Sequence, residues 1–239
     1  MDHDTTLFAS IITKRNFEQV AAEIKRLIYD GTLTPGDRLP SEARLAEQFN
    51  VGRQTVREAI RILELSGLVV VKRGSNGGAF ISEMISDKLH DLFMDALRFN
   101  HVSLEEVTIA RLELERIVAT HAINSATEED MKKLLDNVNQ ARSRIANNQV
   151  ATSLNVEFHN ILAAASKNHV FILVIRTLMD VVEDLLLRLK PDIAASEAVV
   201  EEHQEIVDAL ADKNLTKSIL LLEKHLLGVK ARLDYTYKK

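Results

Sequence analysis

The chain has 239 residues, of which 46% are hydrophobic and 27% charged, and it contains no cysteine. At roughly 150 residues per domain, this length allows one large domain or two small ones. The lack of cysteine excludes a disulfide framework, a cysteine zinc ribbon and a thiol nucleophile. No apolar run approaches the roughly 18 residues of a membrane span. Because Met1–Ser10 carries Asp2 and Asp4 in place of the basic flank of a signal peptide, we expect a soluble cytoplasmic protein.

The net charge of −5 is not spread evenly along the chain. Residues 1–82 carry 11 Lys and Arg against 10 Asp and Glu, whereas the remaining residues carry 19 against 25. Seven of the eight histidines also lie beyond residue 82. This asymmetry predicts two domains with different chemistry, which we place at residues 12–82 and 83–236.

Seven of the eight glycines lie in the first third of the chain, which should therefore consist of short elements joined by turns. Apolar periodicity predicts a helix over residues 17–29, and Ser41 is a suitable N-cap for a short second helix that ends near Asn50. A third helix is expected over residues 53–65, followed by strands at 68–71 and 79–81. Three helices and a β-hairpin in this order predict a winged helix-turn-helix, a fold that binds DNA.

The third of these helices is the one expected to enter a major groove. Arg53, Arg57 and Arg61 follow at four-residue spacing and share one face, while apolar residues occupy the opposite face. Gln54 and Thr55 lie at the helix start, where recognition helices meet base edges. A row of arginines alone is more often a solvated helix face. Its place on the second helix of a helix-turn-helix, beside a basic hairpin, favours contact with DNA.

The rest of the chain has almost no helix breakers and predicts an all-α antiparallel bundle of about seven helices. The expected helices cover about residues 84–99, 104–123, 128–147, 150–166, 169–189, 197–211 and 215–232. Ser103 with Glu106, and Thr127 with Asp130, predict capping boxes at two of the helix starts. The chain as a whole is therefore expected to be mainly α.

The histidines are the informative residues of this bundle. Asn155 and His159 are four residues apart on one expected helix and should project side by side. His203 and His225 lie on the two final helices. Three imidazoles and an amide oxygen could hold a divalent metal and leave positions open, although a single histidine is more often structural than a ligand. The chain has no His-Glu-x-x-His motif, which argues against a zinc protease.

The first domain resembles the DNA-binding domain of the GntR family over about residues 14–82. The resemblance is carried by Pro35–Glu42, Leu45-Ala46, Val51–Arg53 and Val56–Ala59. It implies that Arg53 and Arg57 contact bases and phosphates in the major groove, and that Arg73 and Gly74 of the hairpin contact the minor groove.

Two positions depart from the family pattern. Ala43 replaces the usual arginine of the second helix, and an arginine, Arg44, follows one place later. Gly52 replaces the usual Ser or Thr before the third helix and offers no hydroxyl. The candidate DNA-binding residues are therefore Arg44, Arg53, Gln54, Thr55, Arg57, Arg73 and Gly74.

The second domain resembles the FCD effector domain of the FadR subfamily over about residues 84–232. The resemblance is carried, in order, by Arg111–Glu115, Asn155–His159, Glu202-His203 and His225-Leu226. Many such domains bind a divalent metal through an Asp and three His, and the metal helps to hold a small carboxylate effector. The resemblance implies a zinc or nickel site at Asn155, His159, His203 and His225, with Asn155 where the family has Asp. It also implies that Arg111 binds the effector.

Together these observations predict a DNA-binding transcription regulator, not an enzyme, that responds to a small organic acid. The family resemblance implies a homodimer on a palindromic operator, and repression relieved by a metabolite is the commoner arrangement. Two alternatives remain at this point. The chain could be a dimeric DNA-binding protein that senses nothing and has structural histidines, or a metal-dependent enzyme joined to a DNA-binding head.

Overall fold

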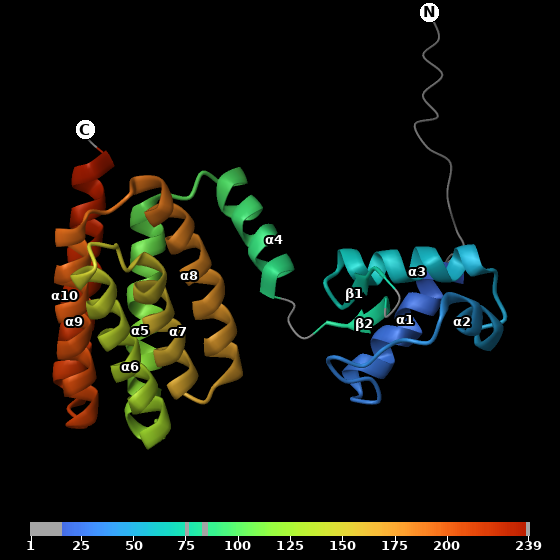
Figure 1. The fold of residues 1–239 in the computed structure, drawn as a ribbon, viewed down its shortest axis with the longest axis horizontal. Helices are drawn as coiled ribbons and strands as arrows, with labels where there is room; N and C mark the ends of the chain where they lie inside the picture. The colour runs from blue at the N-terminus through green and yellow to red at the C-terminus, as the bar shows by residue number, and fades with distance from the viewer. Residues whose placement is uncertain (1–15, 75–76, 83–85, 238–239) are drawn as a thin grey trace, which may run out of the picture. The chain divides into compact units, whose positions relative to one another are not determined.

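The computed structural model describes residues 16–74, 77–82 and 86–237, which form two compact units (Figure 1). The division falls between Lys88 and Leu89, six residues beyond the boundary placed from the sequence. We call the first the head and the second the helical unit. The expectations for Met1–Ser10, for residues 12–15 and for Ser75-Asn76 in the hairpin turn lie outside the described residues.

The described residues of the head form three helices and one antiparallel strand pair, as the sequence predicted. The elements are α1 (Asn16–Tyr29), α2 (Glu42–Gln48), α3 (Arg53–Leu65), β1 (Val69–Lys72) and β2 (Gly78–Ile81). In the strand pair Val69 lies opposite Ile81, and Lys72 lies opposite Gly78. The winged helix-turn-helix fold is thereby confirmed.

The head is held together by one small apolar core. Val56, Ala59 and Leu63 on the inner face of α3 are completely buried, and α3 packs on both α1 and α2. The Ser41 hydroxyl accepts a hydrogen bond from the Arg44 amide and caps α2. Because this core uses one face of α3, the opposite face is left for solvent or a partner.

The helical unit consists of seven helices in the described part of the chain. They are α4 (Ser86–Phe99), α5 (Leu104–Ser125), α6 (Glu128–Ala146), α7 (Thr152–Ala165), α8 (His169–Leu189), α9 (Ile193–Ala211) and α10 (Leu215–Tyr237). The start of α9 differs from the prediction, because Asp192 caps this helix by accepting a hydrogen bond from the Ala195 amide at 2.8 Å. None of the described helices is long and apolar enough to cross a membrane.

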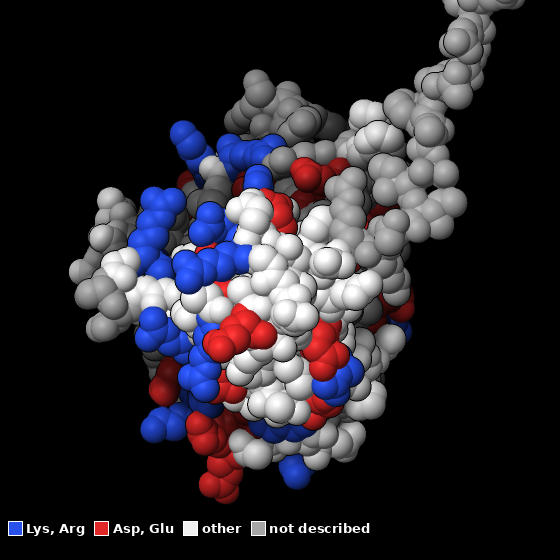
Figure 2. Space-filling view, turned by 90° about the vertical axis from the view of Figure 1, so that its right-hand side faces the viewer, with Lys and Arg blue, Asp and Glu red and all other residues white. Residues whose placement is uncertain are grey.

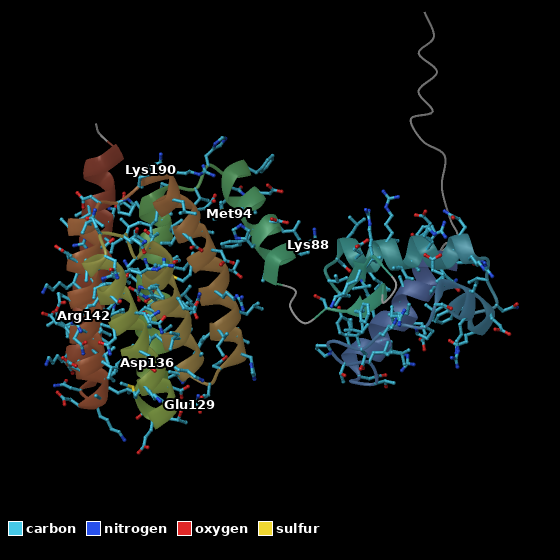
Figure 3. All side chains as sticks on the ribbon, in the orientation of Figure 1. Lys88, Met94, Glu129, Asp136, Arg142 and Lys190 are labelled. Atoms are coloured by element: carbon cyan, nitrogen blue, oxygen red, sulfur yellow. The ribbon has the colours of Figure 1, made fainter. Side chains whose placement is uncertain are left out.

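The core of the helical unit brings together residues distant in sequence. Helix α5 packs against α7, α8 and α10, and α6 packs against α7 and α9. Side chains fill the space between these helices, and the labelled Glu129, Asp136 and Arg142 mark the course of α6 (Figure 3). Both predicted capping boxes form, at the starts of α5 and α6. The helices that carry Arg111, Asn155, His159, His203 and His225 therefore pack on one another.

Asp130 ties the start of α6 to the turn after α7. Its carboxylate accepts hydrogen bonds from the Thr127 amide and hydroxyl at 2.8 and 2.7 Å, and Lys167 Nζ lies 2.5 Å away. Burial alone would raise the pKa of Asp130, but the Lys167 and Thr127 contacts outweigh it and lower this pKa to about 2. The ionised carboxylate is therefore part of the folded state.

We expect Asp130→Asn to lower the free energy of unfolding by about 1.5–3 kcal/mol at neutral pH, because the neutral amide loses the charged contact with Lys167 and accepts weaker hydrogen bonds from Thr127. The folded pKa is depressed, so the wild-type contribution is complete above the unfolded pKa near 3.8 and disappears as the pH falls toward 2. Urea unfolding at several pH values should show the two proteins converging as the pH falls from about 4 to about 2. A constant difference down to pH ~2 would contradict this assignment.

Candidate functional site

The outer face of α3 is polar and open to solvent. Arg53, Gln54, Arg57 and Arg61 are exposed, whereas Thr55 is half-buried. Seen from the side of the head, Lys and Arg side chains gather toward one edge of the visible surface, with acidic side chains scattered among neutral ones (Figure 2). The three arginines predicted to share one face of α3 are therefore all exposed to solvent.

Arg57 is held by a residue that the sequence reasoning did not single out. Its Nη2 donates to Glu42 Oε2 at 2.8 Å, and its Nε lies 3.2 Å from the same oxygen. The hydrogen bond and charge of Glu42 raise the pKa of Arg57. Because Glu42 is the first residue of α2, this pair links the two helices at their exposed surface.

Arg44 lies on α2 beside the hairpin. It follows Ala43, which stands where the family has arginine. With Arg38 and Gly77 it lines an open hollow of about 560 Å³. Arg38 donates a hydrogen bond to the Gly77 carbonyl, and its guanidinium carbon lies 5.8 Å from the centre of the Phe80 ring. A Cβ at Gly77 would lie 2.5 Å from the Lys72 carbonyl oxygen, so the hairpin requires glycine there.

The other hairpin candidates lie on the surface. Arg73 and Gly74 are both exposed. Gly74 has a φ of +110°, which side chains other than glycine rarely adopt. The structure therefore presents every candidate residue of the head except half-buried Thr55 as solvent-exposed.

Three histidines from three helices form the core of the second candidate site. His159 on α7, His203 on α9 and His225 on α10 are all at least 98% buried. One ring nitrogen from each lies within 4.8 Å of those of the other two. The Nε2 atoms of His203 and His225 are 3.3 Å apart. We call these three residues the histidine cluster.

Two glutamates hold two of these rings. Glu115 Oε2 lies 2.6 Å from His159 Nδ1, and Glu202 Oε2 lies 2.7 Å from His225 Nδ1. Each glutamate also pairs with an arginine, Arg111 with Glu115 at 2.5 Å and Arg232 with Glu202 at 3.0 Å. The cluster is thus flanked by two Arg–Glu–His chains.

Burial favours the uncharged form of all three histidines in the cluster. Burial lowers the pKa of His159 well below 6.5, and the positive charge of Arg111 lowers it further. Burial also lowers the pKa of His203 well below 6.5, with the other two histidines adding to the effect. For His225, burial lowers the pKa although Glu202 opposes it. Neutral imidazoles of this kind are ready to act as metal ligands.

A cavity of about 50 Å³ opens beside the cluster and is lined by all five residues predicted for the site: Arg111, Asn155, His159, His203 and His225. Apolar side chains of α8, including Met179 and Val182, complete its wall. At roughly 10–15 Å³ per water-sized group, it can take only a small molecule.

Two polar groups that line this cavity have no protein partner among the described residues. Asn155 Oδ1 is buried and accepts no hydrogen bond. Arg111 is 7% exposed at its side chain and uses Nε for Glu115, while its two Nη atoms have no partner within the described part of the chain. Buried polar atoms are normally satisfied, so the unpartnered Asn155 oxygen points to something that the cavity binds.

The structure brings together the five residues that the sequence grouped, Arg111, Asn155, His159, His203 and His225, but the sequence prediction missed the residues that contact them. Glu115 was detectable, because it follows Arg111 by four residues on one helix. Glu202 and Arg232 were not, because their contacts join α9 to α10 across 23 and 30 residues of chain. Likewise Glu42 reaches Arg57 across 15 residues.

Comparison with known families gives matches to both units. Residues 16–81 match the family described as "Bacterial regulatory proteins, gntR family". Residues 106–228 match the FCD domain. Both matches agree with the resemblances seen in the sequence.

Several curated proteins are similar over most of the chain. The HTH-type transcriptional regulator LutR of Bacillus subtilis is 30% identical over 85% of this chain and 94% of its own. The Uxu operon transcriptional regulator of Escherichia coli is 30% identical over 92% of this chain and 87% of its own. The HTH-type transcriptional repressor NanR of Cronobacter sakazakii is 28% identical over 90% and 84%.

A solved structure is similar over most of the chain. Streptococcus agalactiae GntR has a TM-score of 0.73 at 26% identity, covering 90% of this chain and 99% of that one. Escherichia coli McbR/YncC has a TM-score of 0.51 at 20% identity and supports the fold alone.

The buried histidines predict how metal-free protein responds to acid. Their pKa values are lowered on folding, so the unfolded chain takes up protons at a pH where the folded chain does not. The free energy of unfolding should therefore fall as the pH drops below about 6.5. Urea unfolding of chelator-treated protein would show this slope, reduced in His203→Gln and retained in His121→Gln, which alters an exposed histidine. Equal slopes in all three proteins would refute it.

Proposed function

Because the chain belongs to the GntR family of bacterial regulatory proteins and carries an FCD domain, we propose that it is a regulator switched by a small organic acid. DNA-binding transcription regulation itself follows from both family matches and from relatives named as regulators. The alternative of a metal-dependent enzyme is therefore excluded. The acid would bind in the cavity of the helical unit, at a divalent metal held by the histidine cluster.

The outer face of α3 is the proposed reading surface. Arg53, Gln54 and Thr55 at its first turn would approach base edges, and Arg57 would contact bases or phosphate from the next turn. Arg73 and Gly74 would follow the minor groove, while Arg44 would contact the backbone near the hairpin. The exposure of the arginine row supports this assignment.

Binding to a palindromic operator would require a homodimer, because each head reads one half-site. The helical unit leaves large apolar side chains in solvent, among them Ile109 on α5, Val170 on α8 and Leu220 on α10, which are 58%, 66% and 63% exposed. Such side chains are suited to a subunit contact. We propose repression as the mode of regulation, which is also the activity named for NanR.

The donor set of the cavity fits a transition metal. Three neutral imidazoles and one unpartnered amide oxygen, Asn155 Oδ1, suit zinc or nickel better than magnesium or calcium, which prefer oxygen ligands. In this role His159, His203 and His225 would supply ring nitrogens and Asn155 its carbonyl oxygen. The bound metal would supply positive charge and open positions for the acid.

The single observation that carries the proposal of an acidic effector is the state of Arg111. Its side chain lines the cavity and is 7% exposed, and among the described residues only its Nε has a hydrogen-bond partner. Two free Nη donors match the two oxygens of a carboxylate, the acceptor that arginine binds best. The formal charges of Arg111, Arg232, Glu115 and Glu202 cancel, so a metal would leave an excess of two positive charges for an anion to offset.

The first test concerns the head. Arg57→Ala should weaken binding to a palindromic duplex from upstream of the gene by about 10- to 100-fold, since one base or phosphate contact is worth about 1–3 kcal/mol. The dependence of log K on log salt should also become shallower by about 1 if a phosphate contact is lost. Fluorescence anisotropy at several salt concentrations measures both.

Arg26→Ala is the matched control for this test. Arg26 is an exposed arginine on α1 that pairs with Glu23 and Asp30, away from the proposed reading surface, and its loss should leave affinity unchanged. Arg57→Ala binding as tightly as wild type would refute the assignment of α3.

The second test concerns the metal. Titration calorimetry of chelator-stripped protein with zinc or nickel should give heat that saturates, because the ligands are already neutral and gathered. His159→Ala should abolish or greatly weaken this binding, whereas His121→Ala should not, because His121 is exposed on α5. Absence of heat from the wild-type protein would favour structural histidines and a protein that does not sense through a metal.

A further inference from the structure

We propose that Glu115 and Glu202 are positioning residues of the histidine cluster, and that Glu115 in addition aims Arg111 into the cavity. This inference rests on the proposed metal site for its consequence in binding. The arrangement of the two carboxylates was not anticipated from the sequence and is carried by their contacts. Neither glutamate touches the cavity as a ligand; each acts through the histidine and the arginine that it holds.

Glu115 fixes the tautomer of His159. A buried carboxylate 2.6 Å from Nδ1 accepts the proton of that nitrogen. The neutral ring then has its lone pair on Nε2, on the other side of the ring. Because Glu115 is 1% exposed, water does not compete for this hydrogen bond.

Glu202 does the same for His225 from a different helix. Its Oε2 lies 2.7 Å from His225 Nδ1, which leaves the lone pair of His225 on Nε2. Arg232 holds Glu202 in place with both Nη groups, at 3.1 and 3.0 Å. The donor nitrogens of His159 and His225 are thus both the Nε2 atoms, although the two rings come from α7 and α10.

The third ring is oriented by packing instead of by a carboxylate. His203 stacks on Phe158, with ring centres 3.9 Å apart and planes 8° from parallel. Phe158 precedes His159 on α7 and is completely buried. All three rings are therefore fixed before any ligand arrives, two by glutamates and one by an aromatic face.

The two glutamates differ in what else they hold. Glu115 engages only Nε of Arg111 and leaves both Nη atoms free within the described part of the chain. Glu202 occupies both Nη atoms of Arg232. Loss of Glu115 should therefore disturb the metal ligand and the orientation of the anion-binding arginine together. Loss of Glu202 should disturb the metal ligand and Arg232, which also lines the cavity, but leave the orientation of Arg111 unchanged.

Zinc affinity and nuclear magnetic resonance of the full-length protein test this. Glu115→Gln and Glu202→Gln should each weaken zinc binding by about 10- to 100-fold, as losses of groups behind metal ligands usually do. Matched controls are Glu113→Gln and Glu201→Gln, which alter exposed neighbours on the same helices and should leave zinc affinity unchanged.

The tautomers can be read in metal-free wild-type protein without any variant. Long-range proton–nitrogen correlation spectra should show His159 and His225 protonated at Nδ1, and the Arg111 Nε–H signal should be protected from exchange. In Glu115→Gln that protection should disappear, whereas in Glu202→Gln it should remain. A merely structural glutamate would not produce this difference.

The outcomes separate the inference from the function on which it rests. If wild type binds no zinc, the proposed metal site fails, but Nδ1 protonation still supports the positioning role. If wild type binds zinc and both Gln variants bind it within twofold of wild type, the positioning role is overturned. Protonation at Nε2 of His159 or His225 overturns it as well, even if Glu115→Gln does not fold.

Discussion

The burial of three imidazoles inside an apolar helical core is the constraint on which the rest of the structure depends. A buried polar group without a partner costs on the order of 1–3 kcal/mol, so such a cluster persists only if the fold supplies partners. Glu115 and Glu202 provide them for His159 and His225. These contacts draw α5, α7, α9 and α10 to one point, which is where the cavity lies.

Charge explains why the two units suit different partners. The segment up to residue 82 is nearly neutral overall, yet three of its eight arginines share one exposed face of α3, where DNA would be read. The acidic excess lies in the rest of the chain, much of it in surface ion pairs such as those of Glu129 and Glu201. Inside the helical unit the charges of the two Arg–Glu pairs cancel, so a bound metal would decide whether the cavity attracts an anion.

Much of the fold could be predicted from the sequence, because its signals are local. The capping boxes at Ser103 and Thr127 and the apolar face of α3 marked their helices within a few residues. Asp192 was missed as the cap of α9, because the preceding proline obscured the helix start. Asn155 and His159 were paired correctly by their spacing on one helix.

The rest of the site could not be predicted, because it depends on contacts between helices. Nothing local indicates that Glu202 faces His225, since the two residues meet only when α9 packs on α10. The pairing of Glu42 with Arg57 depends in the same way on the angle between α2 and α3. Sequence identified the residues that could bind a ligand, and only the packed structure identified those that hold them in place.

The central claim is that a metal makes the cavity a receptor for a small acid. The most direct test is a thermal-shift screen of small organic acids, with gluconate and lactate among them, run on metal-loaded protein with and without EDTA. The account predicts that at least one acid raises the melting temperature with metal present and has no effect in EDTA. Equal stabilisation by the same acid in EDTA, or no stabilisation by any acid on metal-loaded protein, would contradict it.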